Sequence, residues 1–94
     1  MITHYTDYCI ICGTPRTDEH HLCFGTANRR LADVDGLTIP LCRKHHEMMH
    51  NDKEMQVMSH IVGQLAYEKR KCSEGFGEEA ARESFRMRYG KSYL

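Results

Sequence analysis

The chain has 94 residues, the length of one small domain, which excludes a two-domain enzyme or a large doubly wound fold. Only 40% of it is apolar, it contains no tryptophan, and its 13 basic and 13 acidic side chains leave no formal net charge. A core of this size is marginal unless a metal site or disulfides stabilise it. Because the chain has no excess of positive charge, its overall charge gives no indication of a nucleic-acid partner.

The cysteines and histidines are concentrated in one part of the chain. Four of the five cysteines and five of the seven histidines lie between residues 8 and 50. The first eight residues lack a secretory signal and no segment is long and apolar enough to cross a membrane, so we expect a cytoplasmic protein with reduced cysteines. We expect one domain over 1–94, with a metal-binding part at 8–50 and a helical extension at 51–94.

Two short strands are expected in the first half of the chain. Residues 17–24 and 37–41 have strand-forming composition and are bounded by turn residues, which favours an antiparallel hairpin with a long connecting loop. Pro40 restricts the second strand to a sheet edge or a strand end.

Helices are expected in the second half, which makes the predicted fold class α+β. They are residues 43–50, a longer helix that begins at Asn51 or Asp52 and ends between 72 and 77, and residues 78–89, which stop at Gly90. In the long helix the apolar residues recur at intervals of three and four and are expected to face the core, with methionine as core filler. These residues are Met55, Met58, Ile61, Val62, Leu65 and Ala66.

Two ligand pairs with finger-like spacing predict a structural zinc site. Cys9 and Cys12 form one pair, and Cys42 and His45 form the other. A gap of two residues lets both side chains of a pair converge on one ion, and two pairs complete a tetrahedral zinc shell. Binding of this kind contributes about 10 to 16 kcal/mol to folding, which would compensate for the small core. The alternative is a set of unrelated buried cysteines.

A second group of histidines predicts a separate metal centre. His46 and His50 are four residues apart, so on a helix they share one face and can chelate one ion. His45 lies about 100° away around the same helix. On the preceding strand His20 and His21 point to opposite faces, so only one of them should bind that ion. The alternative is that these four are ordinary surface or hydrogen-bonded histidines.

The order of these residues resembles that of the HNH endonucleases. The shared pattern is Cys9-x2-Cys12, His20-His21, Cys42-x2-His45 and His46-x3-His50, and the stretch His20-His21-Leu22-x-Phe24-Gly25-x-x-Asn28-Arg29 is similar to small HNH proteins of bacteriophages and prophages. In that family a hairpin and a helix, the ββα-metal motif, surround one catalytic ion, often beside a zinc knuckle. The resemblance therefore implies a small zinc-stapled ββα-metal domain with additional C-terminal helices.

The resemblance also implies a role for each ligand. His20, His46 and His50 would bind a catalytic divalent ion, and His21 would be the general base. The knuckle zinc would be held by Cys9, Cys12, Cys42 and His45. The family also has a middle asparagine about fifteen residues after the base, which braces the loop that carries it. Asp35 and Gly36 occupy that place here, and Asn28 lies only seven residues after His21.

The expected function is metal-dependent hydrolysis of DNA phosphodiester bonds. A site with three imidazole ligands favours Mn²⁺, Ni²⁺, Co²⁺ or Zn²⁺ over Mg²⁺. The expected partner is double-stranded DNA, held by basic residues that flank the metal centre: Arg29 and Arg30 in the loop between the strands, and Arg43 and Lys44 at the helix start.

Two other functions remain open. The chain could be a zinc-stabilised binding module that has the fold without catalysis, which the missing middle asparagine and the balanced charge favour. It could also be an inhibitor or adaptor that docks on a protein through its methionine-rich helix. We attach no chemistry to Cys23 or Cys72.

Overall fold

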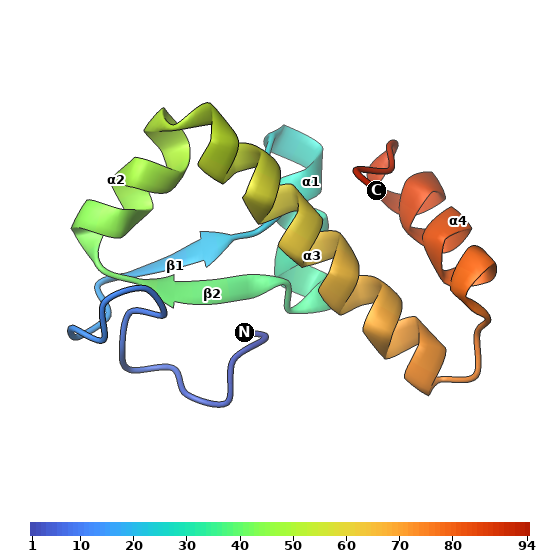
Figure 1. The fold of residues 1–94 in the computed structure, drawn as a ribbon, viewed down its shortest axis with the longest axis horizontal. Helices are drawn as coiled ribbons and strands as arrows, with labels where there is room; N and C mark the ends of the chain where they lie inside the picture. The colour runs from blue at the N-terminus through green and yellow to red at the C-terminus, as the bar shows by residue number, and fades with distance from the viewer.

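The computed structural model describes residues 1–94 and has an α+β architecture with one two-stranded sheet and four helices (Figure 1). The elements follow in the order β1 (Asp18–His21), α1 (Thr26–Asp35), β2 (Thr38–Leu41), α2 (Arg43–Asn51), α3 (Lys53–Ser73) and α4 (Glu78–Tyr89). The predicted fold class, α+β, is confirmed. No helix combines the length and the hydropathy needed to cross a membrane.

The sheet places the histidine dyad next to β2. β1 and β2 are antiparallel, with His20 opposite Ile39 and His21 opposite Thr38. The N-terminal segment runs along β2, where the Ile10 N–H donates to the Pro40 carbonyl at 3.0 Å. The expected hairpin strands are therefore present, and Pro40 lies on an edge strand because the sheet has no third strand.

The first strand is shorter than the predicted range 17–24. After His21 two consecutive residues, Leu22 and Cys23, are both buried, at 1% and 0% exposure. The ladder with β2 stops at the pair His21–Thr38, so both residues lie beyond the last paired position of the strand. The strand therefore ends immediately after the histidine dyad.

The connection between the strands is a helix, and the prediction of a long loop was wrong. α1 covers ten residues and ends at Gly36, which has φ 69°. The Gly36 N–H donates to the Asp33 carbonyl and the Leu37 N–H donates to the Ala32 carbonyl, a Schellman ending. The glycine that sequence analysis interpreted as part of a loop turn is thus the cap of a helix.

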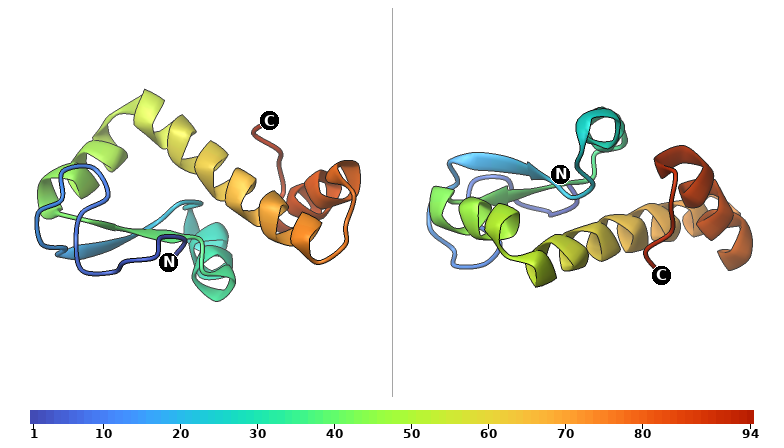
Figure 2. Two further views of the ribbon diagram at one scale, coloured as in Figure 1. Left: turned by 60° about the horizontal axis from the view of Figure 1, so that its bottom comes forward. Right: turned by 90° about the horizontal axis from the view of Figure 1, so that it is seen from above.

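α2 and α3 meet at Asp52. The structure confirms the predicted helix at 43–50, extended by one residue to Asn51. The Asp52 carboxylate accepts from the Glu54 and Met55 N–H groups at 2.9 and 3.2 Å, so it caps the start of α3. The two helices leave this point in different directions, which places α2 beside β1 and lets α3 run along the molecule (Figures 1 and 2).

The long helix does not bury the predicted stripe as a whole. Met58 is 56% exposed and Leu65 is 51% exposed, so the expectation that both fill the core was wrong. Small and polar residues occupy much of the inward face instead, among them Ser59 and Gly63.

The close approach of α3 to Leu22 and Cys23 explains why this face of the helix is buried in place of the predicted one. A Cβ atom built on Gly63 would lie 2.9 Å from the Cys23 sulfur and 3.0 Å from the Leu22 Cβ. Only glycine fits at this distance, so α3 lies directly against the turn that follows β1. Larger apolar residues elsewhere on the helix consequently face outward.

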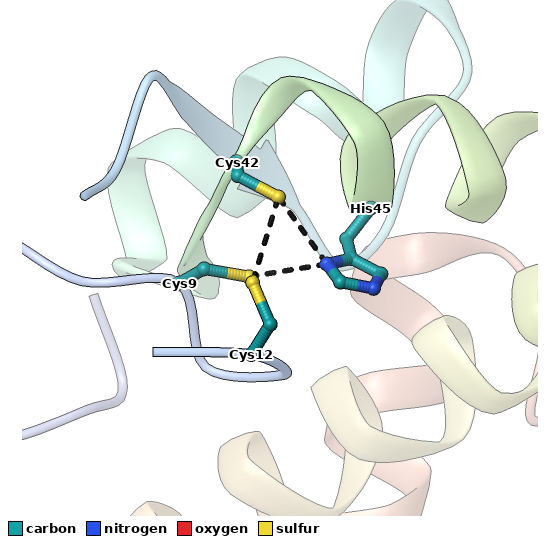
Figure 3. A group of neighbouring side chains, drawn as sticks. All are labelled: Cys9, Cys12, Cys42 and His45. Carbon is teal, nitrogen blue, oxygen red and sulfur yellow. Dashed lines mark hydrogen bonds between the residues drawn. The ribbon is translucent and has the colours of Figure 1, made fainter. Parts of the chain in front are cut away.

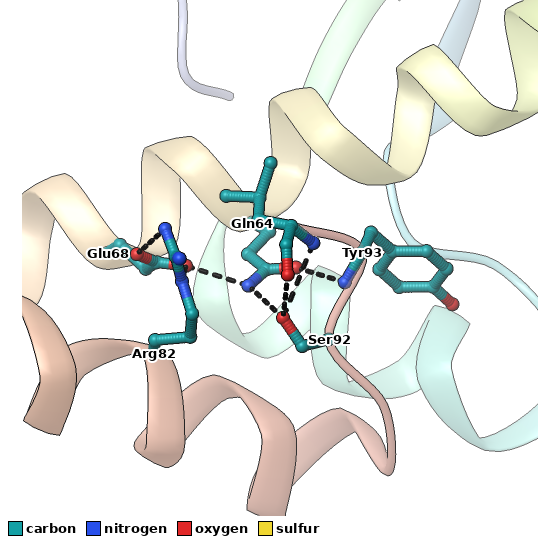
Figure 4. A network of polar contacts seen from close by, with 6 residues as sticks. Gln64, Glu68, Arg82, Ser92 and Tyr93 are labelled. Atoms are coloured by element: carbon teal, nitrogen blue, oxygen red, sulfur yellow. Dashed lines mark hydrogen bonds and ion pairs between the residues drawn. The ribbon is translucent and has the colours of Figure 1, made fainter.

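α4 and the C-terminal tail cover another side of α3. α4 ends at Gly90 as predicted, and its Phe85 and Tyr89 belong to the same buried cluster as Tyr67 of α3. Gln64 ties the tail to α3: its Nε2 donates to Ser92 at 2.9 Å and its Oε1 accepts from the Tyr93 N–H at 2.7 Å (Figure 4). The tail therefore lies along α3.

Candidate metal centres

Four side chains from distant parts of the chain converge in a first cluster (Figure 3). Cys9 and Cys12 come from the N-terminal knuckle, Cys42 precedes α2 and His45 lies in its first turn. Their ligand atoms all lie within 4.8 Å of one another. The Cys12 and Cys42 sulfurs are 3.8 Å apart, and the Cys9 sulfur is 3.6 Å from His45 Nδ1. Tetrahedral zinc ligands at their usual bond lengths lie about 3.3 to 3.8 Å apart, so these residues are close enough to bind a metal.

The knuckle favours thiolates. Gly13, at φ 75°, lets the loop turn tightly and donates its N–H to the Cys9 carbonyl at 2.9 Å. Hydrogen bonds from Thr14, first its hydroxyl and then its backbone, lower the pKa of Cys12 to about 7. Burial raises the pKa of Cys9, but backbone hydrogen bonds, led by that of Cys42, outweigh it and leave this pKa lowered. Thiolate is the form that binds a metal ion.

A second cluster contains three histidines. His20 of β1 and His46 and His50 of α2 each offer a ring nitrogen, and these nitrogens lie within 4.8 Å of one another. The Nε2 atoms of His46 and His50 are 3.1 Å apart. Two imidazole ligands of one ion lie about 3.0 to 3.4 Å apart, so the spacing fits a shared metal. The structure thus brings together the three residues that sequence analysis grouped, and directs His45 to the other cluster.

Ser59 of α3 fixes the tautomer of His20. The Ser59 hydroxyl donates to the Leu22 carbonyl at 2.8 Å, so its oxygen accepts from His20 Nε2, also at 2.8 Å. His20 therefore carries its proton on Nε2, and Nδ1 holds a lone pair. Nδ1 is buried and has no hydrogen-bond partner in the protein. A buried, unpartnered lone pair is what a metal ligand requires before the ion binds.

Asp18 fixes the tautomer of His46 in the same way. Its Oδ2 accepts from His46 Nδ1 at 2.8 Å, which leaves the lone pair of neutral His46 on Nε2. Arg43 donates to both Asp18 oxygens, at 2.9 and 3.1 Å. The hydrogen bond from Arg43, followed by that from His46, lowers the pKa of Asp18, so this carboxylate stays charged.

The environment favours the neutral form of two of the three imidazoles, those of His20 and His50. Burial, assisted by the charges of His46 and His50, lowers the pKa of His20 to about 3. Burial also lowers the pKa of His50, and His46 and Arg29 lower it further. Neutral imidazole is the form that ligates a metal, so these two shifts favour metal binding.

His21 lies beside this cluster and outside it. It is absent from the group of three convergent nitrogens, as the strand alternation predicted for one of the two dyad histidines. It nevertheless lines the same pocket, a cavity of about 120 Å³ that Arg29 also lines. His21 Nε2 lies 3.1 Å from Asp33 Oδ1. Because a carboxylate only accepts, neutral His21 donates its Nε2 proton there and keeps its lone pair on Nδ1.

Asp33 is the residue that orients His21, and none of the positions considered for the middle asparagine does so. Asn28 donates to the Tyr89 carbonyl at 3.2 Å. Asp35 binds Arg88 and Tyr89, and Gly36 caps α1. Asp33 lies only twelve residues after His21 and acts from a helix that sequence analysis did not predict.

Two further polar partners were missed by sequence analysis. Asp18 precedes His20 by two residues on β1, so strand alternation places both on one face, and this signal could have revealed it. Ser59 is 39 residues from His20, and no local pattern connects the two positions.

The four predicted DNA-binding residues differ in their surroundings. Arg29 and Arg30 lie on α1 and not in a loop, and both line a groove next to His21. Arg43 is tied to Asp18, which compensates its charge. Lys44 is exposed at the start of α2.

A family model described as "Protein of unknown function (DUF968)" matches residues 4–74, more than half of the chain. The chain belongs to the DUF968 family. The DUF968 segment contains both side-chain clusters, Asp33 and Ser59, and ends before α4.

One curated relative of this DUF968 chain is "Uncharacterized protein YdfU" of Escherichia coli (strain K12). It is 42% identical over 48 residues, which cover 50% of this chain and 14% of YdfU. The chain therefore matches only a small part of that relative's length. No solved structure matches the DUF968 chain. Neither description assigns an activity.

Proposed function

We propose that this DUF968 protein is an HNH-type, metal-dependent nuclease that hydrolyses DNA phosphodiester bonds. The observation that carries the proposal is the convergence of three histidine nitrogens, two of them with their tautomer fixed by an outer partner, in a pocket that also holds His21. Outer hydrogen bonds that orient imidazole ligands are typical of metal sites. A histidine that is not a ligand yet lines the same pocket is available for acid–base chemistry.

The two clusters are suited to different ions. Cys9, Cys12, Cys42 and His45 would hold a structural zinc, whose charge three thiolates more than compensate. His20, His46 and His50 would hold a divalent transition metal, because imidazole ligands favour Mn²⁺, Ni²⁺, Co²⁺ or Zn²⁺ over Mg²⁺. Bound to three neutral ligands, such an ion would supply positive charge to the scissile phosphate and the departing 3′-oxygen.

His21 takes the role of general base. Its Nδ1 lone pair accepts a proton from water as the water oxygen bonds to phosphorus and the bond to the 3′-oxygen breaks. Asp33 holds the ring through Nε2 and stabilises the imidazolium that forms, because its carboxylate lies 3.1 Å away. In this arrangement Asp33 supplies the bracing that the family's middle asparagine would give.

DNA binding would depend on a local group of cations, because the chain has no net charge. Arg29 is the best placed, since it lines both the histidine pocket and the adjoining groove. Arg30 lines the groove, and Lys44 adds charge at the start of α2. Arg43 contributes less than sequence analysis expected, because Asp18 already accepts two of its hydrogen bonds.

Nicking of supercoiled plasmid tests the proposal. Protein loaded with zinc and then supplied with Mn²⁺, Ni²⁺, Co²⁺ or Mg²⁺ is expected to nick, with Mg²⁺ the least effective. His21→Ala is expected to lower the rate by at least about 100-fold while metal content stays the same. His4→Ala, at an exposed histidine outside the pocket, is the matched control and should retain activity.

Three outcomes would contradict the nuclease. The first is no nicking with any of the four metals, which with retained DNA binding would favour the zinc-stabilised binding module instead. The second is full activity in His21→Ala. The third, activity with Mg²⁺ alone, would argue against a site of three imidazoles.

A further inference from the structure

α3 carries an apolar stripe whose two ends are exposed and whose middle residue, Ile61, is half-buried. Met58, Ile61 and Leu65 follow one another at intervals of three and four residues, so they lie on one face of the helix. Met58 and Leu65 are more than half exposed. Glu54 lies four residues before this group and Lys69 four residues after it, on the same face. We call these five residues the α3 stripe.

The other sides of α3 are occupied. Ser59 and Gly63 face the turn after β1, and Gln64 and Glu68 contact the tail and Arg82 of α4 (Figure 4). Viewed from above, the sheet and α1 lie on one side of α3, and the C-terminal tail crosses the helix and ends on the other (Figure 2, right). Because Met58 and Leu65 are more than half exposed, a second molecule can reach them without displacing any element.

The charges of the α3 stripe are arranged symmetrically about its apolar centre. Glu54 and Lys69 are equally far from the midpoint between Met58 and Leu65, and neither side chain forms an ion pair within the chain. A second copy in antiparallel orientation would place Glu54 against Lys69 at both ends of the contact. A parallel copy would instead place like charges together, so the pattern selects one orientation.

We propose that the α3 stripe is the surface through which two copies of this chain pair as an antiparallel, two-fold symmetric dimer. Met58 of each copy packs on Leu65 of the other, and Ile61 lies beside the two-fold axis. A two-fold interface uses the same patch on both partners, so a single self-complementary stripe is sufficient. The dimer uses no residue of either metal cluster and does not depend on the nuclease proposal.

Sedimentation or light scattering over chain concentrations from about 1 to about 300 μM, a range that brackets micromolar affinity, tests the dimer. The wild-type chain is expected to pass from monomer to dimer in this range. Leu65→Glu and Met58→Glu should stay monomeric, with a helical circular dichroism spectrum equal to that of the wild type. Met87→Glu, at a 74% exposed methionine of α4, is the matched control and should dimerise normally.

Charge reversal tests the orientation. Glu54→Lys alone or Lys69→Glu alone places like charges at both ends of the antiparallel contact and should weaken dimerisation at least tenfold. The double variant Glu54→Lys, Lys69→Glu restores opposite charges and should recover the wild-type dimer. A wild-type chain that stays monomeric at the highest concentration would overturn the proposal. It would do so even if the α3 stripe binds a different protein. So would a dimer that Leu65→Glu leaves intact, or a double variant that fails to recover.

Discussion

Ser59 of α3 determines which nitrogen of His20 is free to bind a ligand. Its hydroxyl donates to the Leu22 carbonyl and accepts from His20 Nε2, both at 2.8 Å, so the lone pair of His20 lies on the buried Nδ1. A residue of the C-terminal half thus sets the chemistry of a residue on the first strand. The long helix is therefore part of the candidate metal centre and does more than support it.

Ser59→Ala is therefore expected to weaken metal binding at the three-histidine cluster by about 10-fold to 100-fold, because His20 loses the partner that fixes its tautomer. Titration with Co²⁺, followed by its visible absorption in zinc-loaded protein, measures this affinity. Ser73→Ala, at an exposed serine of the same helix, is the control. Equal Co²⁺ affinity in Ser59→Ala and wild type would contradict the orienting role.

Sequence patterns identified the members of both clusters because the spacing within each pair of residues is local. The pairs Cys9/Cys12 and Cys42/His45, and His46 with His50, follow from knuckle and helix geometry, and the structure brings each set together. The assignment of adjacent His45 and His46 to different clusters also followed, because one residue turns a helix by about 100°.

The parts that sequence analysis missed depend on tertiary contacts. α1 was interpreted as a loop because its polar sequence and the glycine at its end are also typical of a turn. The buried face of α3 was misplaced because Gly63 and Ser59 are selected by a close approach to Cys23 and to His20, and not by hydrophobicity. Such contacts leave no periodic signal along the chain.

Removal of one ligand of the four-residue cluster is expected to unfold the N-terminal half. Cys42→Ser leaves three ligands, and the contribution of a structural zinc to folding, about 10 to 16 kcal/mol, would be largely lost. Metal content and thermal unfolding of the purified variant check this. Cys72→Ser, at an exposed cysteine outside both clusters, should keep its metal and its melting temperature. A Cys42→Ser variant as stable as the wild type would show that no structural metal is bound.

Asp35 connects α1 to α4 through a pH-dependent contact. Its carboxylate accepts from Arg88 Nε and Nη2 at 2.7 and 2.8 Å and from the Tyr89 hydroxyl at 2.6 Å. Burial raises the pKa of Asp35, but the hydrogen bonds from Arg88 and Tyr89 outweigh it and leave this pKa below its ordinary value. The stability that Asp35 contributes is therefore full above its unfolded-state pKa, about 3.9, and is lost as pH falls through the lower folded-state pKa.

Asp35→Asn is accordingly expected to lower the free energy of unfolding by about 1 to 3 kcal/mol at pH 7, through loss of hydrogen bonds to a charged acceptor. Below about pH 4 the gap between variant and wild type should narrow, because wild-type Asp35 becomes protonated. Urea unfolding of both proteins at pH 7 and pH 3 measures the gap. Glu47→Gln, at an exposed carboxylate without a hydrogen-bond partner, should show no gap. A gap for Asp35→Asn that is independent of pH would contradict the assignment.

Gly63→Ala is expected to destabilise the protein despite the higher helix propensity of alanine. The new Cβ would meet the Cys23 sulfur at 2.9 Å and the Leu22 Cβ at 3.0 Å. Overpacking of this kind costs about 1 to 3 kcal/mol, which exceeds the gain in propensity of at most about 1 kcal/mol. Urea unfolding in a double-mutant cycle with Cys23→Ala checks the cause, because the penalty should shrink when the sulfur is absent. An unchanged penalty would place the clash elsewhere.

Arg29 and Arg30 are adjacent on α1 and are expected to differ in function. Arg29 lines the histidine pocket and its charge contributes to the lowered pKa of His50, whereas Arg30 lines the outer groove but not the histidine pocket. If the protein is a nuclease, Arg29→Ala should lower single-turnover cleavage at saturating DNA by about 100-fold, as for loss of a group that stabilises transition-state charge. Arg30→Ala should weaken DNA binding by about twofold to tenfold and reduce its salt dependence by one phosphate contact, with little change in the saturated rate. The two variants are matched controls, because both positions lie on α1 and carry the same charge. If Arg29→Ala and Arg30→Ala changed the cleavage rate and the DNA affinity equally, Arg29 would act as a general cation and not at the scissile phosphate.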